Sequence, residues 1–279
     1  MAADETRAPP ASSGHVERRI ERWRDGHSEP AGDCIAEEMP IAMRYNGHSY
    51  AVMMATPRDL EDFALGFSLS EGLIDSAAQL NGIDVHHRLE GIELSMAVAS
   101  EAPAARIDRG QERLLPGRSG CGLCGTRELE DAVRPPSPVR ASARFSTMAL
   151  ERALLALDSH QPMNAATGAV HAAAWADAEG RILLAREDVG RHNALDKLIG
   201  AMCRADCRPD GGMLLLTSRA SYEMVTKAAS AGIGFMAAIS APTALAVELA
   251  RSAGICLVGF ARPGGYNVYT HADRLHAGD

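Results

Sequence analysis

The chain has 279 residues, of which 46% are hydrophobic and 23% charged, a composition typical of a globular protein with one large or two modest domains. Its net charge of −8 argues against a nucleic-acid-binding function, because such proteins present broad basic surfaces. No apolar core of a secretory signal follows the first methionine, so we expect a cytoplasmic protein whose six cysteines are reduced.

Three regions are predicted along the chain. Residues 1–30 are polar and rich in Ala, Pro, Ser and Arg, which predicts a disordered tail. Residues 31–147 predict a smaller α+β region, with a hairpin turn at Asn46-Gly47. Thr56 followed by Pro57 predicts the start of a helix whose buried stripe includes Phe63 and Phe67. Within this region, residues 103–140 hold five glycines and seven arginines against five acids, which predicts a mobile, locally basic loop.

Residues 148–279 predict an α/β domain. A helix is expected at 148–159 and a hairpin around Ala178-Glu179-Gly180, after which helices and strands alternate. This alternation predicts a mostly parallel sheet with helices on its faces. The uncharged run 228–247 contains glycine, serine and Pro242, so we interpret it as a strand, a turn and a helix rather than a membrane span.

Polar turns follow the strands of this predicted sheet. Ligands of open α/β sheets bind at the carboxyl ends of the strands, and helix starts and arginines hold phosphate oxygens there. A nucleotide-bearing ligand is therefore one interpretation; helix caps and surface ion pairs are the other. His192 fits a ligand contact and a scaffold role equally well. The residues concerned are His192, Ser218, Arg219, Thr243, Arg262, Gly264 and Gly265.

Lysine is rare, since only Lys197 and Lys227 occur among 28 basic residues. A compact ammonium on a flexible stem is not replaced by the guanidinium of arginine. Either these two positions require lysine, or they are chance choices on helix surfaces.

Cys121 and Cys124 form a Cys-x-x-Cys pair among glycines. A zinc site is one explanation, with Cys203 and Cys207 as the second pair of ligands. A thioredoxin-like pair and plain loop cysteines are two others. We favour a mobile nucleophile, because Arg118 and Arg127 lie near in sequence and favour the thiolate.

Six segments of the chain are distinctive when taken together. They are ALGFSLSEGLI, GCGLCG, REDVGRHNALDK, TSRASYEMVTKAA, PTALAVELA and GFARPGGYNVYT. These segments resemble those of the FdhD family of formate dehydrogenase accessory sulfurtransferases, and they occur in the family's order over about residues 37 to 271.

The resemblance implies that sulfur passes from a cysteine desulfurase to the molybdenum (or tungsten) of a bis-guanine-dinucleotide cofactor, which formate dehydrogenase then receives. Cys121 would bear the persulfide and Cys124 would act as relay or resolving thiol. The cofactor, bound as a substrate, would contact a turn made of Phe260, Ala261, Arg262, Pro263, Gly264 and Gly265. A homodimer would suit a cofactor with two nucleotides. A chaperone that binds the cofactor without sulfur chemistry is the alternative.

The family's fold is similar to cytidine deaminase, a three-layer sandwich. Zinc deaminases use His-x-Glu followed by Pro-Cys-x-x-Cys. Here His192-Asn193-Ala194 lacks the glutamate, and Ser218 and Ser221 stand where the thiolates would be. Because neutral hydroxyls are poor zinc ligands, we expect no metal of the protein's own in this crevice.

Overall fold

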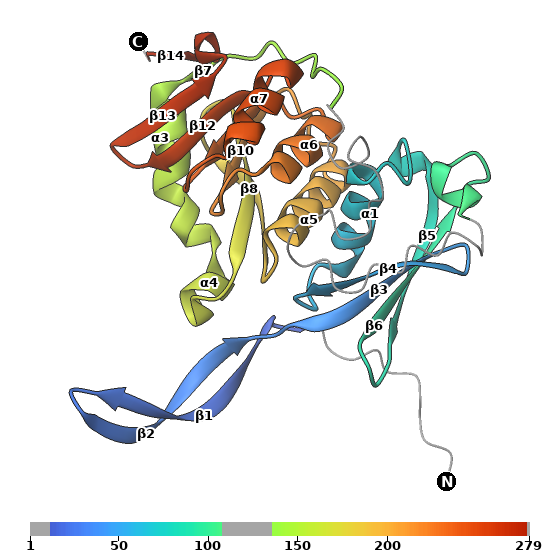
Figure 1. The fold of residues 1–279 in the computed structure, drawn as a ribbon, viewed down its shortest axis with the longest axis vertical. Coiled ribbons are helices and arrows are strands. Elements are labelled where there is room, and N and C mark those ends of the chain that lie inside the picture. Colours follow the sequence, from blue (N-terminus) through green and yellow to red (C-terminus); the bar gives the residue numbers. More distant parts are fainter. Residues whose placement is uncertain (1–11, 108–135, 278–279) are drawn as a thin grey trace.

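The computed structural model describes residues 12–107 and 136–277. It begins with a projecting two-stranded arm, formed by β1 (His15–Arg24) and β2 (His27–Ala36) (Figure 1). Asp25 and Gly26 close the hairpin with φ angles of 50° and 80°, both left-handed. Asp-Gly is a strong signal for such a two-residue turn. The predicted disordered tail is therefore wrong for residues 15–30, because the polar composition concealed a hairpin; residues 1–11 lie outside the described residues.

The N-terminal region is a four-stranded sheet with one helix on it. The strands lie in the order β4-β3-β6-β5, and Asn46-Gly47 forms the predicted turn between the first two. Phe63 and Phe67 of α1 (Leu60–Ser70) pack into the core of this sheet. The bounds are β3 Met39–Tyr45, β4 His48–Ala55, β5 Leu80–His87 and β6 Ile92–Val98.

Helix α1 begins three residues later than predicted. Its N-cap is Asp59, and Thr56 is fully buried instead of capping the helix. The backbone N–H of Thr56 donates to Asp188 Oδ2 over 3.0 Å, and its carbonyl accepts from Lys197 Nζ over 2.9 Å. Long-range contacts therefore occupy the residue that local sequence marked as a cap.

The second sheet has six strands in the order β13-β12-β11-β10-β8-β9. Only β10–β11 and β11–β12 are parallel neighbours, so the sheet is mixed rather than mostly parallel. Nevertheless β9, β10, β11 and β12 all run in one direction, because β9 and β10 both lie antiparallel to β8. The bounds are β8 His171–Asp177, β9 Ile182–Asp188, β10 Gly212–Leu216, β11 Phe235–Ala238, β12 Cys256–Arg262 and β13 Gly265–Thr270.

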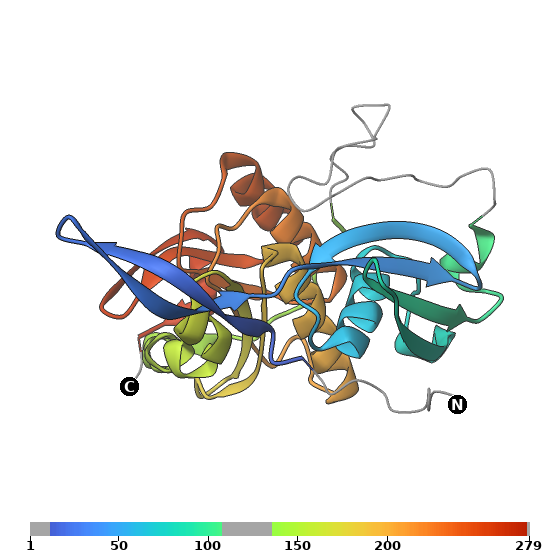
Figure 2. The ribbon, with the colours of Figure 1, turned by 90° about the horizontal axis from the view of Figure 1, so that it is seen from below.

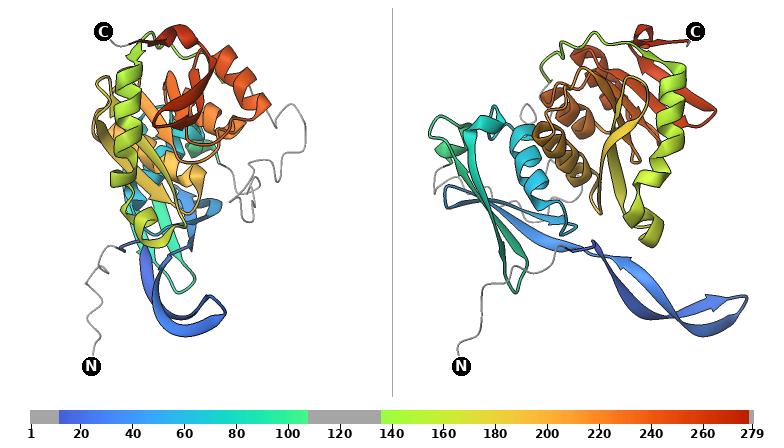
Figure 3. Two further views of the ribbon diagram at one scale, coloured as in Figure 1. Left: turned by 90° about the vertical axis from the view of Figure 1, so that its left-hand side faces the viewer. Right: turned by 180° about the vertical axis from the view of Figure 1, so that it is seen from behind.

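Helices cover both faces of this sheet, which confirms the three-layer α/β class. The helix α3 (Thr147–Ala156) packs on one face, and α5, α6 and α7 pack on the other (Figures 1 and 3). Their bounds are α5 Arg191–Arg204, α6 Tyr222–Ser230 and α7 Ala244–Ala253. The run 228–247 is divided among α6, β11 and α7 as predicted, and none of the described helices is long and apolar enough to cross a membrane.

Short elements complete the described chain. They are η1 Ala77–Gln79, η2 Pro103–Arg106, β7 Phe145–Ser146, η3 Leu157–His160, α4 Pro162–Thr167, η4 Ala272–Arg274 and β14 Leu275–His276.

The two regions meet where α1 crosses α5 (Figure 1). A Cβ on Gly66 would lie 1.7 Å from the carbonyl oxygen of Asp196, and one on Gly200 would lie 2.0 Å from that of Asp62. No side chain fits in such spaces, so the two glycines allow the helix backbones to touch.

Both lysines of the chain lie buried beside this crossing. Lys197 Nζ lies 2.6 Å from Asp188 Oδ2 with neither side chain exposed. Lys227 Nζ lies 2.9 Å from Asp196 Oδ1 and 2.7 Å from Glu71 Oε1. Burial by itself lowers the pKa of Lys227, but the charges of Asp196 and Glu71 outweigh it and raise the pKa above its ordinary value. Of the two explanations, the structure supports the one in which these positions require lysine, because each ammonium group forms a buried ion pair.

Candidate functional site

The carboxyl ends of β9, β10, β11 and β12 share one edge of the six-stranded sheet. Backbone hydrogen bonds hold the loops that follow them side by side. Thr243 N donates to Ala220 O over 3.0 Å, and Phe260 N donates to Ser240 O over 3.1 Å. The edge therefore brings together His192, Ser218, Arg219, Thr243 and the start of the 260–265 segment, as the sequence predicted.

Exposed cations and an aromatic ring line this edge. Arg219 and Arg262 are exposed, and the ring of Phe260 is 48% exposed. Guanidinium groups bind phosphate oxygens with two parallel hydrogen bonds, and an aromatic face can stack on a base. The edge has the chemistry to hold an anionic ligand that carries a planar ring.

Phe260 adopts a strained backbone conformation. Its φ angle is 50°, in the left-handed region, and the pairing of β12 with β13 shifts register between Gly259 and Arg262. For a non-glycine residue this conformation costs about 1–2 kcal/mol. The preceding residue, Gly259, lets Pro242 pack closely on this strand, because a Cβ there would lie 2.7 Å from Cδ of Pro242. Strain of this kind, held by the surrounding structure, is common at ligand-binding positions.

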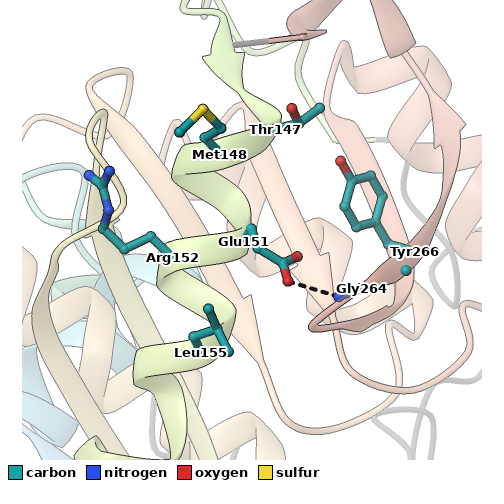
Figure 4. Close-up of a pocket in the computed structure, with 8 residues that line it drawn as sticks. Thr147, Met148, Glu151, Arg152, Leu155, Gly264 and Tyr266 are labelled. Atoms are coloured by element: carbon teal, nitrogen blue, oxygen red, sulfur yellow. Dashed lines mark hydrogen bonds between the residues drawn. The ribbon is translucent and has the colours of Figure 1, made fainter.

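The turn from Arg262 to Gly265 projects beyond the edge and rests against α3 (Figure 4). Pro263 followed by Gly264, whose φ is 86°, is the residue pattern of a type II turn. The N–H of Gly264 donates to Glu151 Oε1 over 2.8 Å. An open pocket of about 680 Å³ lies behind the turn, lined by Thr147, Met148, Glu151, Arg152, Leu155, Gly264, Gly265 and Tyr266.

Two acidic residues of the site were missed from the sequence. Glu151 is 113 positions from its partner Gly264, a separation that no local pattern reveals. Glu223 lies in the segment SYEMVTK, whose pattern predicts a helix but no contact for this residue. Its Oε2 lies 2.8 Å from His192 Nε2, and the two side chains are 14% and 12% exposed. The contact ties the start of α6 to the start of α5.

Arg191 and His171 lie near this contact. Arg191 Nη2 lies 3.9 Å from Glu223 Oε2. His171 begins β8 nearby, and burial, with the charges of Arg191 and His192, lowers its pKa below the ordinary value. His192 therefore has a scaffold contact and also lies at the edge, so both interpretations of it stand.

The hydroxyl residues at the edge do not all act as helix caps, which was one of the two interpretations of the sequence. Thr243 is a helix cap, since its Oγ1 accepts from Ala246 N over 3.3 Å at the start of α7. Ser218 is 3% exposed and does not open a helix, because α6 begins at Tyr222. Ser221 is the N-cap residue of α6, yet its buried Oγ has no hydrogen-bond partner among the described residues.

Cys121 and Cys124 lie outside the described residues. Among the described thiols, burial raises the pKa of Cys256 to about 12. Burial, and then the charge of Asp206, also raise the pKa of Cys203 and Cys207. Thiols with raised pKa values are poor nucleophiles and poor zinc ligands at neutral pH. Within residues 12–107 and 136–277, no three His, Cys, Asp or Glu side chains are placed to hold a metal ion.

Comparisons with known proteins cover nearly the whole chain. The model of the FdhD/NarQ family matches residues 36–276. A protein of Xanthomonas euvesicatoria pv. vesicatoria named "Sulfur carrier protein FdhD" is 55% identical over 265 residues, which cover 95% of this chain and 94% of that one. A protein of Cupriavidus necator with the same name is 51% identical over 272 residues, with the same coverage.

A solved structure supports the fold. The crystal structure of a Desulfotalea psychrophila protein, named as a formate dehydrogenase accessory protein, superposes with a TM-score of 0.71 at 23% identity. The match covers 94% of this chain and 99% of that one, so the N-terminal region and the six-stranded sheet recur together.

Proposed function

The chain belongs to the FdhD/NarQ family, and we propose that it is a sulfur carrier that serves the maturation of formate dehydrogenase. The observation that carries this proposal is the 55% identity to a protein named as a sulfur carrier over 94% of that protein's length. With so little of either chain unmatched, the relative's role transfers with the whole architecture rather than with one motif.

Sulfur moves as a persulfide on Cys121. The Cys121 thiolate attacks the terminal sulfur of a persulfide on a cysteine desulfurase, so that the desulfurase leaves as its thiolate and Cys121 becomes Cys121–S–SH. On delivery, the Cys124 thiolate attacks the inner sulfur. A Cys121–Cys124 disulfide forms, and hydrosulfide is expelled toward the acceptor. Reduction of the disulfide by a cellular thiol then restores both residues.

The acceptor is the molybdenum (or tungsten) of a bis-guanine-dinucleotide cofactor, bound as substrate at the carboxyl edge. The exposed guanidiniums of Arg219 and Arg262 hold its diphosphates, and the ring of Phe260 lies beside a base. Gly264 and Gly265 have no atom within 4 Å of a built Cβ, so the ligand can approach their backbone closely. Because the cofactor has two nucleotides, the carrier works as a homodimer.

Formate dehydrogenase activity in a host that lacks its own carrier tests the proposal. The wild-type chain restores activity, while Cys121→Ala and Cys124→Ala fail to restore it. Cys203→Ala is the matched control, since it removes an exposed thiol with a raised pKa, and it restores activity fully. Full activity with Cys121→Ala would instead favour a cofactor chaperone without sulfur chemistry.

A further inference from the structure

The arm formed by residues 15–36 has no core of its own. Each of its strands has ten residues, and they pair with each other and with no other strand of the described chain (Figures 1 and 2). Five of its apolar side chains belong to none of the three hydrophobic clusters of the described residues, and none of the five packs against those clusters. These side chains are Val16, Ile20, Trp23, Ala31 and Ile35.

Only the base of the arm is held by the body. Gly14 precedes β1 and packs so closely on Met163 of α4 that a Cβ there would lie 2.6 Å from the sulfur. Near the base, Ile35 is still 44% exposed. Near the tip, Trp23 is 70% exposed, on the opposite face of the hairpin from Ile35. A two-stranded hairpin alone in water is at best marginally stable. The arm therefore needs a second surface to pack against, and this surface must be present whenever the chain is folded.

On one face of the arm, apolar and charged residues follow one another in a regular order along the strands. Residues opposite each other in the register share a face, which here gives the pairs Val16–Ile35, Arg18–Asp33, Ile20–Ala31, Arg22–Glu29 and Arg24–His27. From the base outward, the first four pairs alternate between apolar pairs and pairs of opposite charge, while Arg24–His27 beside the turn is neither. On this face β1 contributes only cations among its charged residues, and β2 contributes only anions.

This pattern is complementary to itself. A two-fold axis along the arm would place β1 of one copy over β2 of the other, face to face. Arg18 would then meet the other copy's Asp33, and Ile20 would meet the other copy's Ala31, since each residue faces the one it pairs with in its own arm. A self-complementary patch is what an isologous contact requires.

We propose that the arm is the dimerisation element of this protein, and that the second copy's arm covers this face. The inference deepens the homodimer of the proposed function by assigning the surface that makes it. A second copy fits better than a transient partner, because a hairpin that is unstable alone needs a permanent cover.

Charge exchange between two variants tests the proposal. In Arg18→Asp/Arg22→Glu, residues 18, 22, 29 and 33 of this face are all acidic; in Glu29→Arg/Asp33→Arg, all four are basic. We expect a two-chain mass for the wild type in sedimentation equilibrium and a one-chain mass for each variant alone. An equal mixture of the two variants should recover the two-chain mass, because only the mixed pair restores opposite charges. Leu89→Asp, on a fully exposed turn of the other sheet, should keep the wild-type mass.

A one-chain mass for the wild type would overturn the proposal, as would a two-chain mass for either variant alone or a mixture that stays at one chain. The result is independent of sulfur chemistry. Persulfide loading of Cys121 by a desulfurase, measured on the same samples, reports on the proposed function; its failure would leave the mass result standing.

Discussion

Asp188 and Lys197 form an ion pair of 2.6 Å in which neither side chain is exposed to solvent. Asp188 also accepts hydrogen bonds from the backbone of Thr56 and Gly190 and from Asn193 Nδ2. The pair joins the end of β9 to α5, and through Thr56 it joins both to the N-terminal region. It therefore fixes the loop that places His192 at the carboxyl edge.

Removing one partner of this pair should be costly. Lys197→Met leaves the Asp188 carboxylate buried without its countercharge, and we expect a loss of about 3–5 kcal/mol in the free energy of unfolding. The double variant Asp188→Asn/Lys197→Met removes both charges and should recover a large part of this loss. Urea unfolding of the three proteins measures both effects; a loss below about 1 kcal/mol for Lys197→Met would contradict a structural role.

The crossing of α1 and α5 predicts a strong effect of one methyl group. Gly200→Ala would place a Cβ 2.0 Å from the carbonyl oxygen of Asp62 in the facing helix. We expect destabilisation of about 1–3 kcal/mol from overpacking, although alanine favours a helix more than glycine does. Gly82→Ala is the control, since a Cβ there meets no atom within 4 Å. Equal thermal midpoints for the two variants would show that the helices can separate at no cost.

His171 should make the protein less stable in mild acid. Burial, and then Arg191 and His192, lower its pKa in the folded state. A histidine with a lowered folded pKa contributes stability above its unfolded pKa of about 6.5, and this contribution is lost as the pH falls through the folded value. His171→Gln lacks the titration, so its unfolding midpoint should fall less between about pH 7.5 and pH 5 than that of the wild type. A parallel fall in both proteins would assign the acid sensitivity to other groups.

Alanine substitutions at the two adjacent glycines of the projecting turn should distinguish the effect of backbone strain from that of crowding. Both Gly264 and Gly265 have open space around a built Cβ, but only Gly264 has a positive φ, of 86°. Alanine in a left-handed conformation costs about 1–2 kcal/mol, a factor of 5–30 in an equilibrium constant. A methyl group on either glycine crowds a ligand that approaches this backbone, but only Gly264→Ala also adds backbone strain. In calorimetry, Gly264→Ala should therefore weaken binding of guanosine diphosphate by that factor more than Gly265→Ala does. Equal effects would show that backbone strain at residue 264 does not influence binding.

Local sequence patterns predicted the elements well, and long-range contacts changed their details. The order of helices and strands after residue 168 and the turn at Asn46-Gly47 are confirmed. The sequence holds two conflicting signals for the arm: Asp25-Gly26 indicates a hairpin turn, whereas the polar composition around it indicates disorder. The sheet is mixed because β8 and β13 enter it through hairpins, whereas the prediction weighed the alternation of helices and strands.

The candidate edge followed from strand order, but its polar contacts did not. The pairs Glu151–Gly264 and His192–Glu223 join residues far apart in sequence, and no periodicity indicates which acid meets which partner. The rarity of lysine in this sequence did indicate that its two positions are structurally constrained. The only two in the chain are both buried in ion pairs, so the unusual composition marked real constraints, although on folding rather than on chemistry.

The mass of the intact protein after incubation with a cysteine desulfurase and cysteine, without reductant, tests the sulfur-carrier role most directly. The sample is a variant in which serine replaces the thiols at Cys34, Cys203, Cys207 and Cys256, leaving Cys121 and Cys124. We predict a gain of one sulfur atom that dithiothreitol reverses and that Cys121→Ala abolishes. No gain in this variant and in the wild type, with active desulfurase present, would contradict the sulfur-carrier role.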